Sequence, residues 1–129
     1  MKKILLVVLA IVALFVYFFV TKKSPFLSYT IEGKKYQLMT AKNNAEWTRG
    51  LMNYRNKKEL KGADGMIFIF PDKDYRQFWN QNTYLDLDVY WISGDKVVGK
   101  DKLPSIEKSK NAVVIYSPNG VDRVVEIVK

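Results

Sequence analysis

Apolar residues run without interruption from Ile4 to Val20, the longest hydrophobic segment of the chain. A lysine pair precedes this run at positions 2 and 3, and another follows at positions 22 and 23. A helix of that length, at about 1.5 Å per residue, spans roughly 25 Å, near the lower limit for crossing a hydrocarbon core of about 30 Å. We therefore expect a transmembrane helix with basic flanks over residues 1–23, embedded in the membrane through residues 4–20.

A cleaved signal peptide is the alternative interpretation of this segment. Its apolar region is usually shorter, and a small-x-small cleavage site should follow. The residues from Phe18 to Lys23 contain no such site, and the chain has no cysteine for lipid attachment. We favour an uncleaved signal anchor. Because lysines flank both ends, the positive-inside rule distinguishes only weakly between the two orientations of the helix. The lysine pair at positions 2 and 3 favours an amino terminus in the cytoplasm.

Beyond the anchor the pattern shortens into strands. Residues 24–27 are expected to form a linker that Pro25 stiffens, and residues 28–129 a single domain. Two strands are predicted, at 27–32 and 35–39, around a turn in which Gly33 supplies a positive φ. A helix is predicted from Ala41 to Asn53 with Thr40 as its cap, because apolar residues gather on one side at a helical period.

The rest of the chain has the pattern of short strands. Met66 to Phe70 is apolar at every position, as in a strand covered on both faces, and Pro71 should end it. Further strands are predicted at 75–80, 84–92, 96–100, 112–116 and 123–128, with a loop at 101–111. Within 84–92 the apolar residues alternate and should face the core: Leu85, Leu87, Val89 and Trp91.

This element order predicts a mainly β, α+β domain: a small, partly closed β-barrel with one packed amphipathic helix, preceded by the transmembrane helix. The 129 residues leave room for one domain plus an anchor. The chain has no histidine and no cysteine, which removes the commonest general base, the commonest metal ligand and all thiol chemistry. No cofactor and no metal site are expected.

The formal charge of +8 raises the question of an anionic partner. The basic residues are scattered, with small pairs such as those at 34–35 and 57–58, and no nucleic-acid recognition motif is visible. We expect no nucleic-acid partner. A lysine-rich surface can instead lie near anionic lipid headgroups.

Four short elements occur in a fixed order between residues 49 and 89. They are Arg49-Gly50-Leu51-Met52, Gly65-Met66-Ile67-Phe68-Ile69-Phe70, Phe78-Trp79-Asn80-Gln81-Asn82-Thr83 and Leu87-Asp88-Val89. In this order they resemble the family known as domain of unknown function 192, a set of small, mostly exported or membrane-tethered bacterial and archaeal domains. The resemblance covers residues 28–128 and implies a domain outside the cytoplasm, without a settled activity.

The chain departs from the family pattern in several places, one of them Tyr54, which stands where relatives usually carry an arginine. Asn80 and Gln81 stand where relatives commonly carry Met-Lys, and Asp86 stands where they carry proline. The sequence also stops soon after the strand that contains Glu126, where relatives usually continue through a short helix and a last strand. An open sheet edge is therefore expected.

The third and fourth elements contain the candidate ligand-binding residues Trp79, Asn82, Thr83 and Asp88. An aromatic ring, an amide, a hydroxyl and a carboxylate suit a polar small molecule, such as an envelope sugar. Each residue also has an ordinary structural role: tryptophans are often core, Asn-Thr is typical of turns, and Asp88 can pair with Arg49 or Arg76. Glu46 and Arg49 are spaced for a surface ion pair.

Asp86 and Asp88 offer an alternative acid or metal face. Two residues apart on a strand, they should point the same way, with side chains about 6–7 Å apart. Paired carboxylates can serve in hydrolysis or bind a divalent cation. Because Asp86 replaces the family's proline, a shared mechanism cannot need both, so we name no catalytic residue and do not expect an enzyme.

The expected function is accordingly that of a single-pass, membrane-anchored binding or accessory domain outside the cytoplasm at the cell envelope. Its expected partners are the membrane, a polar small molecule or envelope sugar, and an envelope protein. The alternative is a carboxylate-dependent hydrolase or divalent-metal site at Asp86 and Asp88.

Overall fold

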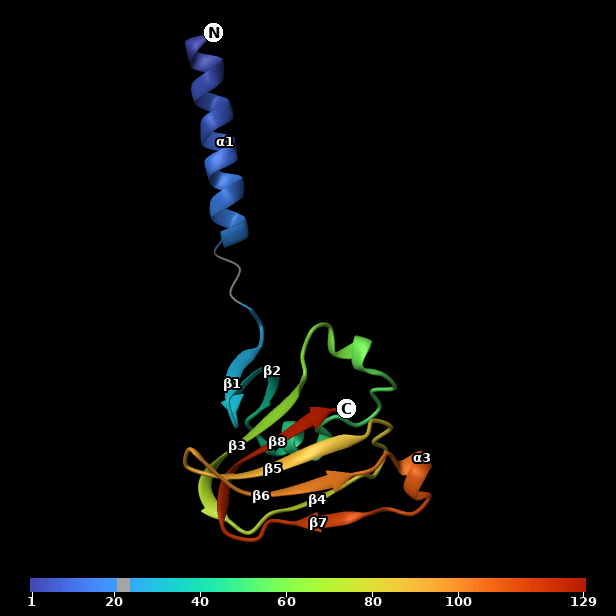
Figure 1. The fold of residues 1–129 in the computed structure, drawn as a ribbon. Coiled ribbons are helices and arrows are strands. Elements are labelled where there is room, and N and C mark those ends of the chain that lie inside the picture. The colour runs from blue at the N-terminus through green and yellow to red at the C-terminus, as the bar shows by residue number, and fades with distance from the viewer. Residues whose placement is uncertain (21–23) are drawn as a thin grey trace.

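The computed structural model describes residues 1–20 and 24–129 (Figure 1). It begins with helix α1 (Lys2–Val20), whose window from Lys2 to Phe19 is long and apolar enough to cross a membrane and has none of its surface buried. The predicted apolar helix is confirmed. Its second basic flank, at positions 22 and 23, lies outside the described residues.

The domain is built on a six-stranded sheet in the order β1-β2-β3-β8-β5-β6. The bounds of these strands are β1 Leu27–Ile31, β2 Lys34–Ala41, β3 Gly65–Asp74, β5 Leu87–Ser93, β6 Lys96–Leu103 and β8 Val121–Val128. A second sheet pairs β4 (Gln77–Trp79) with β7 (Val114–Tyr116). A short helix, α3 (Ile106–Ser109), lies within the segment predicted as a loop at 101–111.

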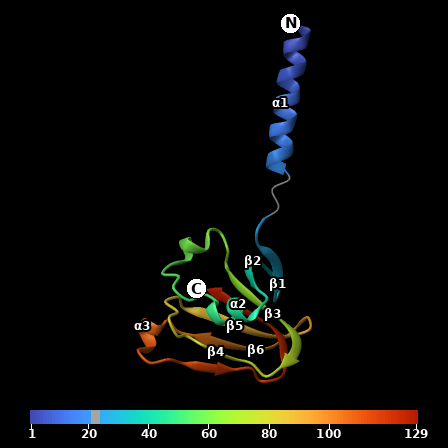
Figure 2. The same cartoon turned by 180° about the vertical axis from the view of Figure 1, so that it is seen from behind.

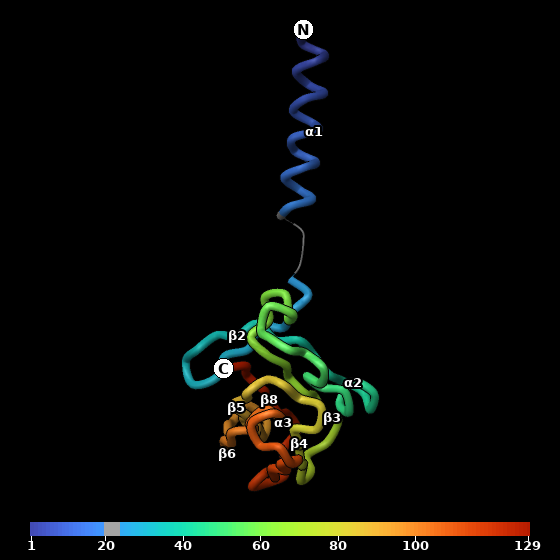
Figure 3. The backbone as a smooth tube through the Cα atoms, turned by 90° about the vertical axis from the view of Figure 1, so that its right-hand side faces the viewer, coloured from blue at the N-terminus to red at the C-terminus, as the bar shows by residue number. Residues whose placement is uncertain are grey.

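The connection from β2 to β3 crosses over because these two strands are parallel. It contains helix α2 (Asn44–Arg49) and a single 3-10 turn, η1 (Lys57–Leu60) (Figure 3). The predicted helix from Ala41 to Asn53 is therefore too long, and its predicted cap is wrong. Ala41 pairs with Phe68 in the sheet, and Asn43 caps the helix by accepting a hydrogen bond from the Glu46 backbone N–H.

Strand β3 continues through Pro71, where the sequence predicted an end. Its pairing with β8 shifts in register between Ile69 and Asp74. Proline lacks the backbone donor for a regular ladder and is accommodated where the pairing is irregular. Beyond this irregular segment the chain leaves the six-stranded sheet and continues into β4.

The six-stranded sheet is not closed into a barrel, so the predicted barrel is not supported. Its edge strands, β1 and β6, share no backbone pairing. The turn after β1 contacts β6 through side chains: the Lys100 ammonium lies 2.6 Å from the Glu32 carboxylate. Both side chains are about half exposed, and such a contact holds two edges near each other without the ladder that closure requires.

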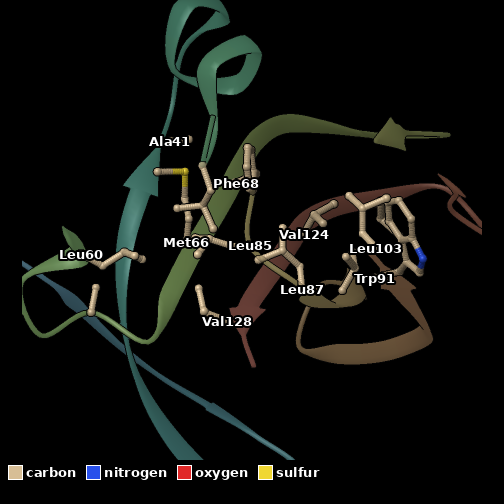
Figure 4. Packing of buried hydrophobic residues seen from close by; sticks show 14 residues of the cluster. Ala41, Leu60, Met66, Phe68, Leu85, Leu87, Trp91, Leu103, Val124 and Val128 are labelled. Atoms are coloured by element: carbon tan, nitrogen blue, oxygen red, sulfur yellow. The ribbon is translucent and has the colours of Figure 1, made fainter. Parts of the chain in front are cut away.

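Hydrophobic residues fill both faces of the sheet. Along β8, Val124 and Val128 belong to the larger cluster, whereas Val125 and Ile127 belong to a smaller one on the opposite face. Figure 4 shows the larger cluster, which extends from Phe68 and Met66 at one side, past Val124, to Trp91 at the other. Residues of α2 and of the β4–β7 pair pack against this cluster and cover its face of the sheet (Figure 2). The predicted alternation in 84–92 is confirmed, since all four apolar residues are buried.

Candidate functional site

A cavity of about 390 Å³ opens where the end of α2, the middle of β3 and strand β4 converge. Its volume falls within the range of about 300–1,000 Å³ that small-molecule pockets occupy. Nearly half of its lining belongs to two of the sequence elements named above, Arg49-Gly50-Leu51-Met52 and the one that begins at Phe78. The lining residues are Trp47, Thr48, Arg49, Gly50, Leu51, Met52, Phe68, Phe70, Tyr75, Arg76, Gln77, Phe78, Trp79, Thr83 and Glu126.

Gly50 brings the end of α2 against β3. It ends the helix with a φ of +47°, which side chains rarely adopt, and a Cβ there would lie 3.1 Å from the Phe68 ring. Leu51 follows and is buried in the core. The Gly-Leu-Met element thus forms one wall of the cavity by turning sharply over an aromatic ring.

Aromatic rings make up much of the rest of the lining. The ring of Phe78 meets Phe68 edge to face at 4.8 Å, and Trp47 lies 4.9 Å from Phe70 between ring centres. The Trp47 indole N–H donates to the backbone carbonyls of Ala41 and Ile69, which fixes its orientation. These rings are locked by packing, so the cavity is preformed.

Glu126 places a carboxyl group in the lining from the central strand β8. It is paired across the sheet with Met66 of β3 and Val89 of β5, both apolar. The residue is 4% exposed, and its side chain has no hydrogen bond or ion pair with any described residue. Burial raises the pKa of this carboxyl from 4.5 to about 8, because a low-dielectric environment disfavours the charged form.

Two arginines also line the cavity, and they differ in how they are held. The Arg76 guanidinium lies 3.0 Å from the Asp72 carboxylate and stacks over the Phe70 ring at 4.0 Å. Arg49 is exposed and forms no ion pair within the described residues. The predicted Glu46–Arg49 pair is absent there, since the Glu46 carboxylate accepts from the Lys42 backbone N–H instead.

Of the four predicted ligand residues, the structure brings Trp79 and Thr83 together at the cavity. Trp79 is 52% exposed, so it is a surface ring rather than a core residue. Thr83 is buried, and its hydroxyl donates to the Gln81 carbonyl. Its neighbour Asn80 is fully buried and binds Pro104, Ser109 and Val113 through its amide, which anchors the turn beneath the cavity.

Asn82 and Asp88 lie outside the cavity lining. Asn82 is exposed, adopts a φ of +53°, and accepts a hydrogen bond on its carbonyl from Asn53. Asp88 lies on β5 with its carboxylate 3.6 Å from the Lys129 ammonium. It alternates with buried Leu87 and Val89, which face the core on the cavity side, so it points away from the cavity.

The Asp86 carboxylate is already engaged. It pairs with the Lys108 ammonium and accepts a hydrogen bond from the Ser105 backbone N–H. These bonds hold the pKa of Asp86 below its ordinary value of 3.8, which suits a permanent charge rather than a general acid. Within residues 1–20 and 24–129, no group of three or more His, Cys, Asp or Glu side chains is placed to hold a metal ion.

Glu126 is the site residue that the sequence analysis did not single out. The sequence does carry a signal for it: the run from Val124 to Val128 is apolar except for this one carboxylate. A charged residue alone in a strand buried on both faces must either find a partner or remain neutral. The run becomes a central strand only because β8 enters between β3 and β5.

Comparison with protein families matches residues 27–129 to domain of unknown function 192 (DUF192), described as Uncharacterized ACR. Comparison with curated proteins gives no match. A protein of unknown function from Novosphingobium aromaticivorans DSM 12444 is 23% identical, with a TM-score of 0.61 over 78% of this chain and 70% of that chain. A candidate transcription regulator from Sinorhizobium meliloti 1021 is 24% identical, with a TM-score of 0.60 over 82% of this chain and 84% of that chain. Identities this low support a likeness of fold alone. Because the matched residues make up most of its length, the chain belongs to the DUF192 family.

Proposed function

We propose that this protein is a membrane-tethered binding module that holds a small organic molecule in the cavity between α2, β3 and β4. The observation that carries the proposal is the pairing of an exposed aromatic ring, Trp79, with a buried carboxyl that has no described partner, Glu126. A ring offers stacking surface, and a single buried polar group orients whatever stacks on it. The ligand is a small molecule with an apolar face, such as a sugar or an aromatic compound.

The helix α1 supports the membrane part of the proposal. Its apolar window has a mean hydropathy of 2.4, and every residue from Ile4 to Phe19 is exposed. Burial of such a surface in lipid removes it from water without any need for the domain to cover it. The domain faces outward from the cytoplasm in this proposal, as the family resemblance implies.

Binding is tested by a thermal-shift screen on the full chain in non-ionic detergent micelles, against sugars, peptidoglycan fragments, small aromatic compounds and divalent ions. We expect at least one organic compound to raise the melting temperature, and Trp79→Ala to abolish that rise. Tyr116→Ala is the matched control, because Tyr116 is 65% exposed on β7 and does not line the cavity. A shift with metal ions alone, lost in Asp86→Asn, would favour the carboxylate face instead.

The tether is tested by cell fractionation. The full chain should remain with the membrane after carbonate extraction, at its full length, and protease added outside the cytoplasm should digest the domain. Release of a shortened, soluble domain would show that the segment is a cleaved signal peptide. Protection from the protease would place the domain on the cytoplasmic side.

A further inference from the structure

The chemical surroundings of Glu126 narrow the class of ligand, provided that the proposed function holds. Glu126 is 4% exposed and lines the cavity from β8, with apolar Met66 and Val89 beside it on the neighbouring strands. No described residue donates a hydrogen bond to it or pairs with its charge. A buried carboxyl in this condition lacks a donor, and the open side of the cavity is where a donor can enter.

We infer that the cavity binds a small amine, whose ammonium group pairs with the Glu126 carboxylate while its apolar part lies against Trp79. An ammonium brings three donors and a positive charge, and charge-assisted hydrogen bonds are roughly twice as strong as neutral ones. The Trp79 ring adds to the attraction, because the negative face of an aromatic ring favours a cation. Where Glu126 is ionised, a ligand carboxylate would instead bring a second negative charge toward it.

The other charged and titratable groups that face the cavity do not oppose a cation at its floor. They are Arg49 from α2, and Tyr75 and Arg76 from the segment between β3 and β4. Arg76 is neutralised by Asp72, and Arg49 is exposed, so water screens its charge. Neither guanidinium lies within ion-pair distance of Glu126.

Binding of an amine should displace a proton. Glu126 carries its proton at neutral pH, since burial raises the pKa of its carboxyl to about 8. When an ammonium ion enters, the carboxyl O–H bond breaks, the electron pair stays on the carboxylate, and the proton leaves to solvent. The products are an ammonium–carboxylate pair in the cavity and one proton in the buffer. The affinity for the amine therefore rises with pH until Glu126 is ionised in the empty cavity.

The test is isothermal titration calorimetry on the full chain in non-ionic micelles, with empty micelles as the blank. The probes are 2-phenylethylamine, 2-phenylethanol and 3-phenylpropanoate, which share a ring and differ in their polar end. We expect the amine to bind at least tenfold more tightly than either other probe at pH 8.5. Its affinity should fall about 25-fold from pH 8.5 to pH 6.5, as the ionised fraction of Glu126 falls, whereas the alcohol's should not change.

Two further measurements make the result specific to Glu126. For release of one proton, the binding enthalpies measured in phosphate and in Tris at pH 6.5 should differ by nearly the full difference between the ionisation enthalpies of the two buffers, a measurement on the unaltered protein. Glu126→Gln should reduce amine binding to the level of the alcohol and remove the proton release. Tryptophan fluorescence checks that this variant is folded.

Each remaining outcome counts against the inference. Equal affinity for amine and alcohol, with both lost in Trp79→Ala, would overturn the amine assignment and leave the proposed binding function intact. Tighter binding of 3-phenylpropanoate would overturn it in favour of an anionic ligand held at Arg49. No binding of any probe would overturn the amine assignment, and an empty thermal-shift screen in addition would overturn the proposed function.

Discussion

Substitution of Glu126 by glutamine should change how the stability of the domain depends on pH. In the folded protein burial raises the pKa of this carboxyl from 4.5 to about 8, so the folded state holds a proton that the unfolded state releases. The stabilising effect of that proton is complete below pH 4.5 and is lost as the pH rises toward 8. Above pH 8 no further loss comes from this group.

The size of the effect follows from the two pKa values. A rise from 4.5 to about 8 corresponds to roughly 5 kcal/mol of unfolding free energy, of which about 4 kcal/mol falls between pH 5 and pH 9. Glutamine has nearly the same shape and no charge to lose. The variant should therefore match the wild type near pH 5 and exceed its stability by roughly 4 kcal/mol near pH 9.

The assay is urea denaturation of both full chains in the same non-ionic detergent, at five pH values from 5 to 9. All three tryptophans, Trp47, Trp79 and Trp91, lie beyond helix α1, so their fluorescence reports on the domain alone. Other titrating groups are common to both proteins and cancel in the difference. A difference that changes by less than about 1 kcal/mol over this range would refute the burial of an unpaired carboxyl at this position.

Three further substitutions probe the supports of the cavity. Asn80→Ala should lower the unfolding free energy by roughly 3 kcal/mol, measured by urea denaturation, because it removes three hydrogen bonds of a fully buried amide. Gly50→Ala should cost about 1–2 kcal/mol in the same assay, since φ is +47° and the new Cβ meets the Phe68 ring; an unchanged midpoint would contradict that account. Asp86→Asn should lower the melting temperature at pH 7. Because the pKa of Asp86 is held below 3.8, the gap to the wild type should close as the pH falls through that range, and a gap constant down to pH 2 would argue against the Lys108 pair.

The strands were predictable because their signals are local. The alternation that buries Leu85, Leu87, Val89 and Trp91 is visible in the sequence and depends only on the two-residue period of a strand. The predicted helix failed for the opposite reason. The residues around Ala41 have the apolar period of a helix, but Ala41 pairs with Phe68 in a parallel ladder and therefore belongs to β2. The crossover that follows contains a helix of only six residues.

The candidate site was predictable in part. Trp79 and Thr83 come from one continuous element, so their association in a cavity needed no knowledge of the fold. Asp88 is also close in sequence, but its side chain lies on the face of β5 opposite to buried Leu87 and Val89, away from the cavity. Glu126 reaches the cavity because β8 pairs with β3 across more than fifty residues, and nothing local to residue 126 indicates which strands flank it.

The central place of β8 has a consequence for how the domain is made. Strands β1, β2 and β3 form one half of the sheet and β5 and β6 the other, and β8 alone joins the two halves within the part of the chain that the structure describes. Until residues 121–128 are in place, β3 and β5 each present an unsatisfied inner edge, the kind of edge that pairs with other chains. Pairing at such sequence separation is slow. Folding of the sheet is therefore completed only when β8 is available: a chain arrested before residue 121 is prone to aggregate, however complete its earlier hairpins are.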